Sequence, residues 1–368
     1  MLAACAGAPR TGLPALPAAA SLAPLDLGAE RLMKITACLR PFRPAGPRLE
    51  AERFGEKTVV HNYGHGGSGW SLSWGCAAEA ATLARAGGAA RFAVVGAGVI
   101  GLTTALRLVE TGAEVTLYAA EFPADTRSAR ATGVWSPSSR IGLADAVPPG
   151  FAERWEAWAR AAYPAHQAMV GQGGEAVEFL PSYEVTEPDG PAGTRATRDF
   201  LHLDRRLRDI VPPWSELDGS ANPYAPRPAA RGYGMVFNIA GYADRLTERF
   251  LARGGRMVRR VFADRAAVLA LAEPVIVNCM GFGAKTIWGD DGMVPVRGQI
   301  AWFVPQPEAR YALFYQRISA ISRRDGVIVQ YTGPNEDFGY GDPLETVDRG
   351  ETERAIATLR RLGPERIR

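Results

Sequence analysis

Three glycines in the stretch AVVGAGVIG, at positions 96, 98 and 101, form the pattern Gly-x-Gly-x-x-Gly. Between a strand and a helix, Gly96 would make a tight turn, Gly98 would let a pyrophosphate approach the backbone, and Gly101 would let the helix pack on the strand. The helix N-terminus then attracts the phosphates through its free N–H groups and its dipole. The pattern predicts a dinucleotide site, with an ordinary glycine-rich turn as the alternative.

Such a site needs an acidic residue about 20 positions further on, where a carboxylate binds a ribose hydroxyl. Glu121 lies at that distance from Gly101, directly after the strand-like stretch AEVTLYAA. Glu121 is therefore the predicted ribose ligand, and a solvated loop carboxylate is the alternative.

A second glycine-rich stretch, HNYGHGGSGW, spans residues 61–70. Glycine offers no side chain to pack and costs backbone entropy, so this density predicts that another group approaches the backbone closely. His61 and His65 could be interpreted as a metal pair, but no further ligand stands at a suitable spacing. We expect no metal site.

The strands and helices that must position these residues can be predicted from the spacing of apolar residues along the chain. Strands are expected at 34–39, 57–63, 91–95, 113–120, 274–280, 298–304 and 326–332, and helices at 71–87, 99–112, 151–170, 243–253 and 351–362. Residues 91–120 form a strand–helix–strand unit, which predicts an α/β fold with a parallel sheet.

The 368 residues exceed the usual size of one domain, so we expect two. A net charge of +3 gives no indication of nucleic-acid binding, and no apolar run reaches the length of a membrane span. The four cysteines lack disulfide or metal-ligand spacing.

The first thirty residues are rich in alanine, proline and leucine and show neither a strand nor a helix period, which is typical of a leader or tether. The segment Leu2–Cys5 resembles a lipoprotein processing site, where Cys5 would carry a lipid. We therefore expect export to the periplasm or a membrane surface, with a cytoplasmic location as the alternative.

Several motifs together resemble the D-amino-acid oxidase family, the flavin enzymes related to D-aspartate oxidase. They are AVVGAGVIGLTTAL, ATGVWSP, RGGRMVRRV, VIVNCMGFGA, PVRGQI, LRPFRPAGPRLE and VVHNYGHGGSGWSLSWGCA. The resemblance covers most of residues 34–368 and is weakest at 140–230. It implies bound FAD, a Rossmann-like FAD-binding domain and a substrate (cap) domain with a mixed sheet.

The motif order differs from that of the family, in which the Rossmann strand comes first and the RPxR and NYGHGG segments come last. Here those closing segments precede the Rossmann strand. The resemblance therefore implies a circular permutation, in which the family's last helix runs through the linker AGGAA into its first strand. Such a rearrangement is physically reasonable because domain termini often lie close together.

The resemblance also implies the roles of individual residues. Arg40, the first arginine of the RPxR pattern, would bind the substrate carboxylate, the backbone at Gly67 would receive the substrate amine, and Tyr315 would help to hold the carboxylate. Arginine suits this role because its planar fork binds a carboxylate bidentately. The second tyrosine expected in the family's pattern is replaced by Ser319. Arg43 and Arg48 are interpreted as surface arginines.

The cofactor-binding residues implied by the resemblance and the glycine motif share a position beside a glycine-rich turn or at a strand end. They are Gly66, Gly67, Gly69, Trp70, Ser71, Gly96, Gly98, Val99, Ile100, Gly101, Glu121, Ser128, Gly133, Val134, Trp135, Val261 and Gly281.

The predicted domains are a leader at 1–33, an FAD-binding domain at 41–135 and 235–290, and a substrate domain at 34–40, 136–234 and 291–368. The implied activity is oxidative deamination of D-amino acids, with hydride transfer to flavin N5 and reduction of O2 to H2O2. The alternatives are a flavin dehydrogenase that uses a quinone-type acceptor and a non-catalytic flavin-binding protein. A nicotinamide dehydrogenase would not explain the NYGHGG segment. The preferred side chain and the oligomeric state stay open.

Overall fold

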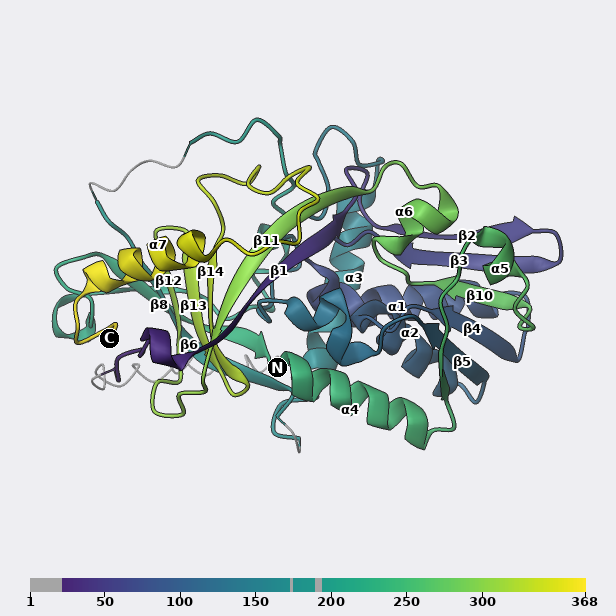
Figure 1. Ribbon diagram of the computed structural model, residues 1–368, viewed down its shortest axis with the longest axis horizontal. Helices are drawn as coiled ribbons and strands as arrows, with labels where there is room; N and C mark the ends of the chain where they lie inside the picture. The colour runs from purple at the N-terminus through teal and green to yellow at the C-terminus, as the bar shows by residue number, and fades with distance from the viewer. Residues whose placement is uncertain (1–21, 173–174, 189–193) are drawn as a thin grey trace, which may run out of the picture.

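A computed structural model of the chain describes residues 22–172, 175–188 and 194–368. Within these residues the chain forms two lobes, each built around one β-sheet, and the long strands β1 (Leu32–Phe42) and β11 (Val294–Phe303) run from one lobe towards the other (Figure 1). The α/β fold class predicted from the sequence is confirmed.

The first lobe contains a six-stranded sheet that is parallel except for one antiparallel hairpin at its edge. Its strand order is β2 (Arg48–Phe54), β3 (Lys57–Tyr63), β10 (Val275–Asn278), β4 (Arg91–Val95), β5 (Glu114–Ala119) and β9 (Arg256–Arg259). The central strands are apolar on both sides because helices cover both faces of a parallel sheet. Along β4, for example, Val94 faces one core cluster whereas Ala93 faces the other.

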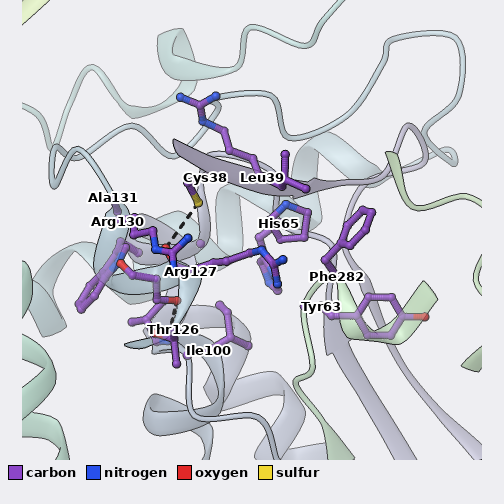
Figure 2. A pocket seen from close by; sticks show the side chains of 18 of the residues that line it. Cys38, Leu39, Tyr63, His65, Ile100, Thr126, Arg127, Arg130, Ala131 and Phe282 are labelled. Carbon is purple, nitrogen blue, oxygen red and sulfur yellow. Dashed lines mark hydrogen bonds between the residues drawn. The ribbon is translucent and has the colours of Figure 1, made fainter. Parts of the chain in front are cut away.

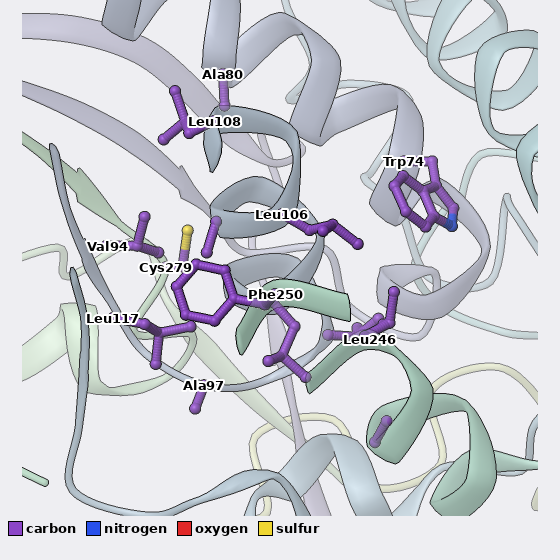
Figure 3. Close-up of a cluster of buried hydrophobic side chains, with 14 of the residues drawn as sticks. Trp74, Ala80, Val94, Ala97, Leu106, Leu108, Leu117, Leu246, Phe250 and Cys279 are labelled. Carbon is purple, nitrogen blue, oxygen red and sulfur yellow. The ribbon is translucent and has the colours of Figure 1, made fainter. Parts of the chain in front are cut away.

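Helices on the two faces complete this lobe. The helices α1 (Gly69–Arg85), α2 (Val99–Val109) and α4 (Ile239–Ala252) share one hydrophobic cluster with the sheet, and α5 (Arg265–Leu269) and α6 (Gly283–Trp288) share the other. Figure 3 shows the first cluster, in which Leu106 and Phe250 lie beside Leu117 of the sheet. The strand β4, the helix α2 and the strand β5 form the predicted strand–helix–strand unit.

The second lobe contains an eight-stranded mixed sheet in which β12 and β6 are parallel and the other neighbours are antiparallel. Its order is β1, β11, β14 (Gly326–Tyr331), β13 (Ile318–Arg323), β12 (Ala312–Tyr315), β6 (Val177–Val185), β8 (Ala229–Phe237) and β7 (Ser215–Leu217). The helix α7 (Arg349–Leu359) packs against one face. Short 3-10 helices occur at Ala29–Arg31, Pro123–Asp125, Arg127–Arg130, Asp204–Leu207, Gly219–Ala221 and Arg360–Leu362.

The helix α3 (Phe151–Gln167) differs from its predicted domain assignment. Residues 136–234 were assigned to the substrate domain, but Trp155 and Trp158 of α3 pack against Leu72 and Cys76 of α1. The reason is the apolar stripe of α3, which needs a helical partner and finds it on the first lobe.

The start of the described chain also differs from the predicted leader at 1–33. Leu25 and Leu27 are buried, and their backbones pair with the C-terminal residues 366–368 through hydrogen bonds of 2.8–2.9 Å. Residues 22–32 therefore belong to the second lobe. Cys5 lies outside the described residues. Among the described helices, none is both long and apolar enough to span a membrane.

Candidate active site

A cavity of about 620 Å³ lies between the two lobes and contains most of the residues singled out from the sequence. Its walls come from the start of α2, the loop at 62–70, the strand β1 and the segment 126–140, together with β11, β13 and β14 of the second lobe. Figure 2 shows Ile100 of α2, His65 of the loop and Cys38 of β1 around this space. The volume is that of a site for a small molecule or cofactor.

The three glycines of the dinucleotide motif each meet a distinct steric demand. Gly96 has a φ of +111°, and a Cβ there would lie 2.4 Å from the Cys279 carbonyl oxygen. A Cβ on Gly101 would lie 1.8 Å from the Gly96 carbonyl oxygen. Gly98 is the N-cap of α2 and lines the cavity with Gly96, whereas Gly101 supports the packing behind it.

Ser128 lies directly beside this helix start. Its Oγ accepts a 3.1 Å hydrogen bond from the Val99 backbone N–H, and a Cβ on Gly98 would lie 2.9 Å from the same Oγ. The Ser128 carbonyl accepts a 2.9 Å hydrogen bond from the indole of Trp70. The helix start, the segment around Ser128 and the loop at 62–70 are therefore held together.

The predicted ribose ligand lies at the adjoining end of the cavity. Glu121 lines the wall beyond β5, and Val261 lines it beyond β9, because the carboxyl ends of these parallel strands meet at one edge of the sheet. Arg127, Arg130 and Arg260 also line the cavity and were not predicted. Arg127 and Arg130 both pair with Glu345, so one carboxylate offsets part of their charge, and the net positive charge of the three arginines favours a phosphate-bearing ligand.

The glycines of the NYGHGG loop lie in close contact with the backbone of another segment. A Cβ on Gly66, whose φ is +55°, would lie 1.9 Å from the Arg140 carbonyl oxygen. The Gly67 N–H donates a 2.9 Å hydrogen bond to the Ser139 carbonyl. The close approach predicted from the sequence is thus made by the protein segment 139–140, while Gly66, Gly67 and Gly69 also line the cavity.

Two polar atoms at the cavity wall have no hydrogen-bond partner among the described residues, Nε2 of His65 and Oδ1 of Asn62. Burial lowers the pKa of His65 to about 3, so its imidazole is neutral at ordinary pH. A buried polar atom without a partner costs free energy. Both residues line the cavity, but these two atoms are themselves enclosed by protein.

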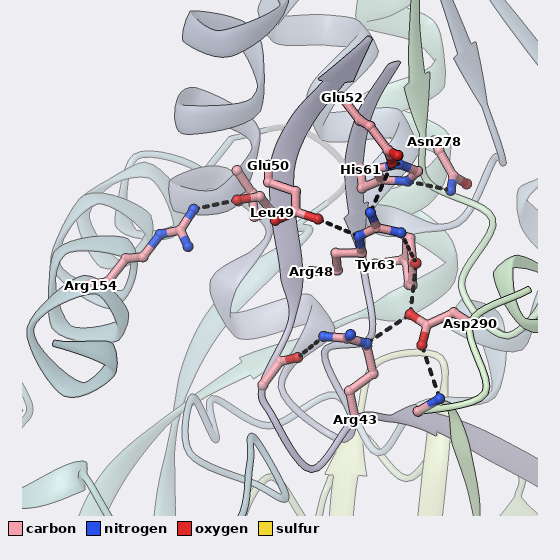
Figure 4. Close-up of polar contacts among 12 residues, drawn as sticks. Arg43, Arg48, Leu49, Glu50, Glu52, His61, Tyr63, Arg154, Asn278 and Asp290 are labelled. Atoms are coloured by element: carbon pink, nitrogen blue, oxygen red, sulfur yellow. Dashed lines mark hydrogen bonds and ion pairs between the residues drawn. The ribbon is translucent and has the colours of Figure 1, made fainter. Parts of the chain in front are cut away.

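His61 belongs to a structural network rather than to a metal site. Its ring contacts Glu52 at 3.2 Å and Asn278 at 3.1 Å (Figure 4). Within the described residues there is no group of three His, Cys, Asp or Glu side chains that could hold a metal ion.

Two arginines interpreted as surface residues, Arg43 and Arg48, belong to the neighbouring polar network. The Nε atom of Arg43 donates to Asp290 at 2.9 Å, and Asp290 also accepts a 2.8 Å hydrogen bond from Tyr63. Arg48 contacts Tyr63 at 3.4 Å and pairs with Glu50 (Figure 4). The surface interpretation was incomplete, because Arg48 links β2 to Tyr63 of β3 and Arg43 links the turn at Gly46 to Asp290.

Arg40 lines the cavity from β1. Its Nη1 donates a 3.2 Å hydrogen bond to the Arg297 carbonyl, and it forms no ion pair with a carboxylate of the described residues. Desolvation lowers the pKa of the Arg40 guanidinium from its usual value. A desolvated arginine without a carboxylate partner suits a carboxylate-bearing ligand.

The prediction that Tyr315 contacts substrate is wrong. Its side chain is buried in the cluster beneath α7, and its hydroxyl donates a 2.7 Å hydrogen bond to Glu187. Successive residues of a strand face opposite sides, so Phe314 lines the cavity and Tyr315 faces away from it. Ser319, across the tight turn, does line the cavity.

Two further predicted cofactor residues, Trp135 and Ser71, do not line the cavity but pack behind its wall. The indole of Trp135 packs edge-on against Tyr163 with 5.0 Å between ring centroids, and Ser71 Oγ accepts a 2.8 Å hydrogen bond from the Ser136 N–H. The other predicted residues of this segment and of the glycine turn after β10 do line the cavity; they are Gly133, Val134 and Gly281. Residues that the sequence did not single out also line it, among them Cys38, Arg140, Gln330 and Thr332.

The residues present fit FAD. At the start of α2, Gly96 and Gly98 present backbone without side chains to the cavity, and Arg127, Arg130 and Arg260 line the same cavity. These features match a long polar ligand with phosphates at one end.

Comparisons with known proteins identify relatives of this chain. The chain is 32% identical over 214 residues to a D-amino-acid oxidase of Streptomyces coelicolor, covering 56% of this chain and 57% of that protein. It is 60% identical over 57 residues to a D-amino-acid oxidase of Rubrobacter xylanophilus, covering 15% of this chain and 17% of that protein. The chain thus spans about half or less of the length of these relatives.

Among solved structures, glycine oxidase from Geobacillus kaustophilus superposes with a TM-score of 0.51 at 16% identity, covering 75% of this chain and 79% of that chain. This likeness shows a shared fold. The family described as DAO, FAD dependent oxidoreductase, matches residues 91–368, and its match begins at the first residue of β4. With three quarters of its length matched, this chain belongs to the DAO family of FAD-dependent oxidoreductases.

Proposed function

We propose that this chain catalyses the FAD-dependent oxidative deamination of D-amino acids to imino acids, with O2 as the electron acceptor. One observation carries the proposal. Arg40, which has no carboxylate partner among the described residues, lines the same cavity as the start of α2 and the loop at 62–70. A carboxylate anchor and a dinucleotide cradle in one cavity suit an amino-acid substrate held beside a flavin.

The residues that would hold FAD follow the cavity from end to end. The start of α2 at Gly98 and Val99 would hold the pyrophosphate, Glu121 would hold a ribose hydroxyl, and the loop at Gly66–Trp70 would line the ring system. When bound, FAD supplies the acceptor for the hydride that leaves the substrate Cα.

The chain itself binds and orients the substrate. The guanidinium of Arg40 would hold the carboxylate through two parallel hydrogen bonds, and the backbone at Gly67 would receive the amine. With both groups fixed, only one enantiomer directs its Cα–H bond towards the acceptor. The absence of a nucleophile–base pair from this proposal is consistent with the chemistry, because the cofactor performs the difficult step.

Spectroscopy of the purified, FAD-loaded protein tests the proposal. Under anaerobic conditions a panel of D-amino acids should bleach the visible flavin band, and the L-enantiomers should leave it unchanged. Readmitted O2 should restore the band and yield one peroxide per flavin. Restoration only by a quinone would identify a dehydrogenase, and a flavin that no amino acid reduces would contradict the proposed activity.

A further inference from the structure

Arg323 lies directly behind one stretch of the cavity wall, residues 131–134. Its Nη1 donates hydrogen bonds to two successive backbone carbonyls, those of Ala131 and Thr132, both at 3.0 Å. Arg323 is the last residue of β13 and does not itself line the cavity. One side chain of the second lobe therefore holds two consecutive peptide groups of the wall.

The position of Arg323 is fixed by further contacts. Its side chain is fully buried, and its Nε and Nη2 donate to the two carboxylate oxygens of Asp325 at 2.7 and 2.8 Å. Its guanidinium carbon lies 4.9 Å from the centre of the Trp302 ring. A buried ion pair adds little net stability, because the cost of removing two charges from water offsets their attraction. The stability of the fold alone therefore does not explain this pair.

The next peptide group of the wall is held from the same side. The Gly133 carbonyl accepts a 2.7 Å hydrogen bond from the N–H of Phe237, the last residue of β8. Gly133 has a φ of +76°, and a Cβ there would lie 2.5 Å from the Phe237 carbonyl oxygen and 2.6 Å from Nη1 of Arg323. Only glycine fits at this position. Three successive carbonyls thus point to partners behind the wall.

The N–H groups of the same peptides point the other way, since the N–H and C=O of a planar trans peptide are directed oppositely. They belong to Thr132, Gly133 and Val134, all of which line the cavity. The partners of the three carbonyls do not line it, so these N–H groups are directed towards the cavity. None of the three has a hydrogen-bond acceptor among the described residues. Consecutive free N–H groups suit an electron-rich ligand atom.

This stretch lies between two parts of the site that are assigned to different parts of FAD. Ser128, which contacts the start of α2, precedes it, and Ser139, whose carbonyl accepts from the Gly67 N–H, follows it. The start of α2 would hold the pyrophosphate, and the loop at Gly67 would line the ring system. Residues 132–134 therefore adjoin the flavin ring, whose carbonyl oxygens and ring nitrogens accept hydrogen bonds.

We propose that Arg323 is a positioning residue for the flavin: by holding the carbonyls of Ala131 and Thr132 behind the wall, it directs the N–H groups of residues 132–134 to the ring. Arg323 acts through the wall and does not touch the cofactor. This inference rests on the proposed function for the place of FAD in the cavity but not for the reaction, and its tests use no amino acid.

The first test measures FAD affinity in two variants of the full chain. Arg323→Met keeps a long side chain but removes every donor, and the Kd for FAD should rise roughly 10- to 100-fold, the loss expected for about two hydrogen bonds. Arg323→Lys should recover only part of this, because an ammonium cannot replace the planar fork that holds a carboxylate and two carbonyls together. Titration of the FAD-free protein, followed by quenching of FAD fluorescence, gives both values.

Deuterium exchange measures the N–H groups themselves. In the wild type, saturating FAD should slow exchange in the peptide that contains residues 131–136, because N–H groups that donate to a bound ligand are protected. In Arg323→Met, saturated with FAD in the same way, this slowing should be smaller.

The reduction potential of the bound flavin separates positioning from a merely structural role. Hydrogen-bond donors beside the ring tune its electronic properties, and they stabilise the electron-rich reduced ring more than the oxidised ring. The potential should therefore be lower in Arg323→Met than in the wild type, with Arg323→Lys between them. Reduction with a chemical reductant in the presence of a reference dye measures it.

Arg227→Met is the matched control. Arg227 also pairs with a carboxylate, that of Glu187 at 2.8 Å, and donates to a backbone carbonyl, that of Arg361 at 3.1 Å, but it neither lines the cavity nor contacts residues 131–134. This variant should keep the wild-type Kd, exchange and potential. Circular dichroism of each FAD-free variant shows whether it is folded.

Wild-type FAD affinity and potential in a folded Arg323 variant would overturn the proposal. Equal changes in Arg227→Met, or loss of folding in both Arg323 variants, would also overturn it, because Arg323 would then be only structural. A wild-type flavin that no amino acid reduces would instead overturn the proposed function, and these measurements would still decide on Arg323. A wild-type chain that binds no FAD would overturn both.

Discussion

Gly298 lies against the guanidinium of Arg40: a Cβ built on Gly298 would be 2.5 Å from both Nη1 and Nη2. The position of Arg40 therefore depends on glycine, which has no side chain, at position 298 of the neighbouring strand β11.

Replacing Gly298 with alanine should displace Arg40 without touching the cofactor motif. Because a shift of about 1 Å in a positioning group can lower rates on the order of 100-fold, we expect kcat/KM for D-amino acids to fall roughly 10- to 100-fold. FAD content should stay near that of the wild type. The matched control is Gly87→Ala, outside the cavity, where nothing lies within 4 Å of the added methyl. Equal kinetics in both variants would contradict the steric argument.

Removing the anchor itself should have a larger effect. Arg40→Ala leaves a bound carboxylate without its partner, which costs about 2–5 kcal/mol, or roughly 30- to several-thousand-fold in kcat/KM. Arg40→Lys should recover only part of this, because an ammonium cannot bind both carboxylate oxygens in the same way. Steady-state kinetics together with flavin content separate substrate from cofactor effects. Wild-type kcat/KM in Arg40→Ala would exclude Arg40 as the anchor.

Gly98→Val tests the cofactor cradle. The added side chain would lie against Ser128, since even a Cβ reaches 2.9 Å from its Oγ, and it would fill the space at the start of α2. We expect the purified variant to fold and to bind little or no FAD, measured as flavin absorbance per protein after reconstitution. Gly87→Ala, in an exposed turn with nothing within 4 Å, is the control and should bind FAD normally. Full FAD binding by Gly98→Val would place the pyrophosphate elsewhere.

Buried histidines should make the protein less stable in mild acid. His166 is buried between Tyr242 and the Ser71 carbonyl, and burial lowers its pKa to about 4. Between pH 6.5 and 4 the unfolded state binds a proton that the folded state does not, so the free energy of unfolding falls as pH falls through this window. At pH 5 the loss is on the order of 2 kcal/mol for this histidine.

Urea denaturation of the FAD-free protein at pH 7 and pH 5 measures the effect. His166→Gln should be less stable at pH 7, because it loses buried hydrogen bonds, yet should show a smaller decrease between the two pH values. The decrease in the free energy of unfolding that remains in that variant should come from the buried His61 and His65, whose pKa values are also lowered. An identical pH dependence in both proteins would contradict this assignment.

The circular permutation stays a prediction, and the paired chain ends make it testable. A flexible linker of about ten residues from Arg368 to Leu22, with new ends opened in the exposed turn at 87–90, should give a protein that folds and binds FAD. Its circular dichroism spectrum and flavin content should match those of the original chain. Loss of folding in this variant, with the same linker tolerated as a C-terminal tail, would argue against the rearrangement.

The local elements of the first lobe were predictable because their signals lie within short windows. The apolar run of β4, the glycines before α2 and the apolar spacing in α1 each specify one element, and each was found where the sequence placed it. The strand β2 was missed, since its exposed, charged residues show no apolar alternation.

The cavity wall was only partly predictable. Glycine motifs can be recognised within a short stretch of sequence. Arg140 could not be recognised in this way, because it lies at the site through the packing of Gly66, which is distant in sequence, against its backbone. Tyr315 failed for a different reason: a shift of one residue along a strand exchanges the two faces of the sheet, and sequence similarity alone did not determine which residue of the Phe314–Tyr315 pair faces the cavity.

The pairing of Leu25 and Leu27 with residues 366–368 has a consequence for synthesis on the ribosome. Leu25 and Leu27 have hydrogen-bonding partners that are synthesised more than 300 residues later, and β1 and β3 likewise have neighbours, β11 and β10, that are synthesised more than 200 residues later. Neither sheet can be completed while the nascent chain is short, so both lobes must finish folding after translation has passed these late strands. Until then apolar side chains of the early strands lack the neighbours that bury them, which makes the incomplete chain prone to aggregation.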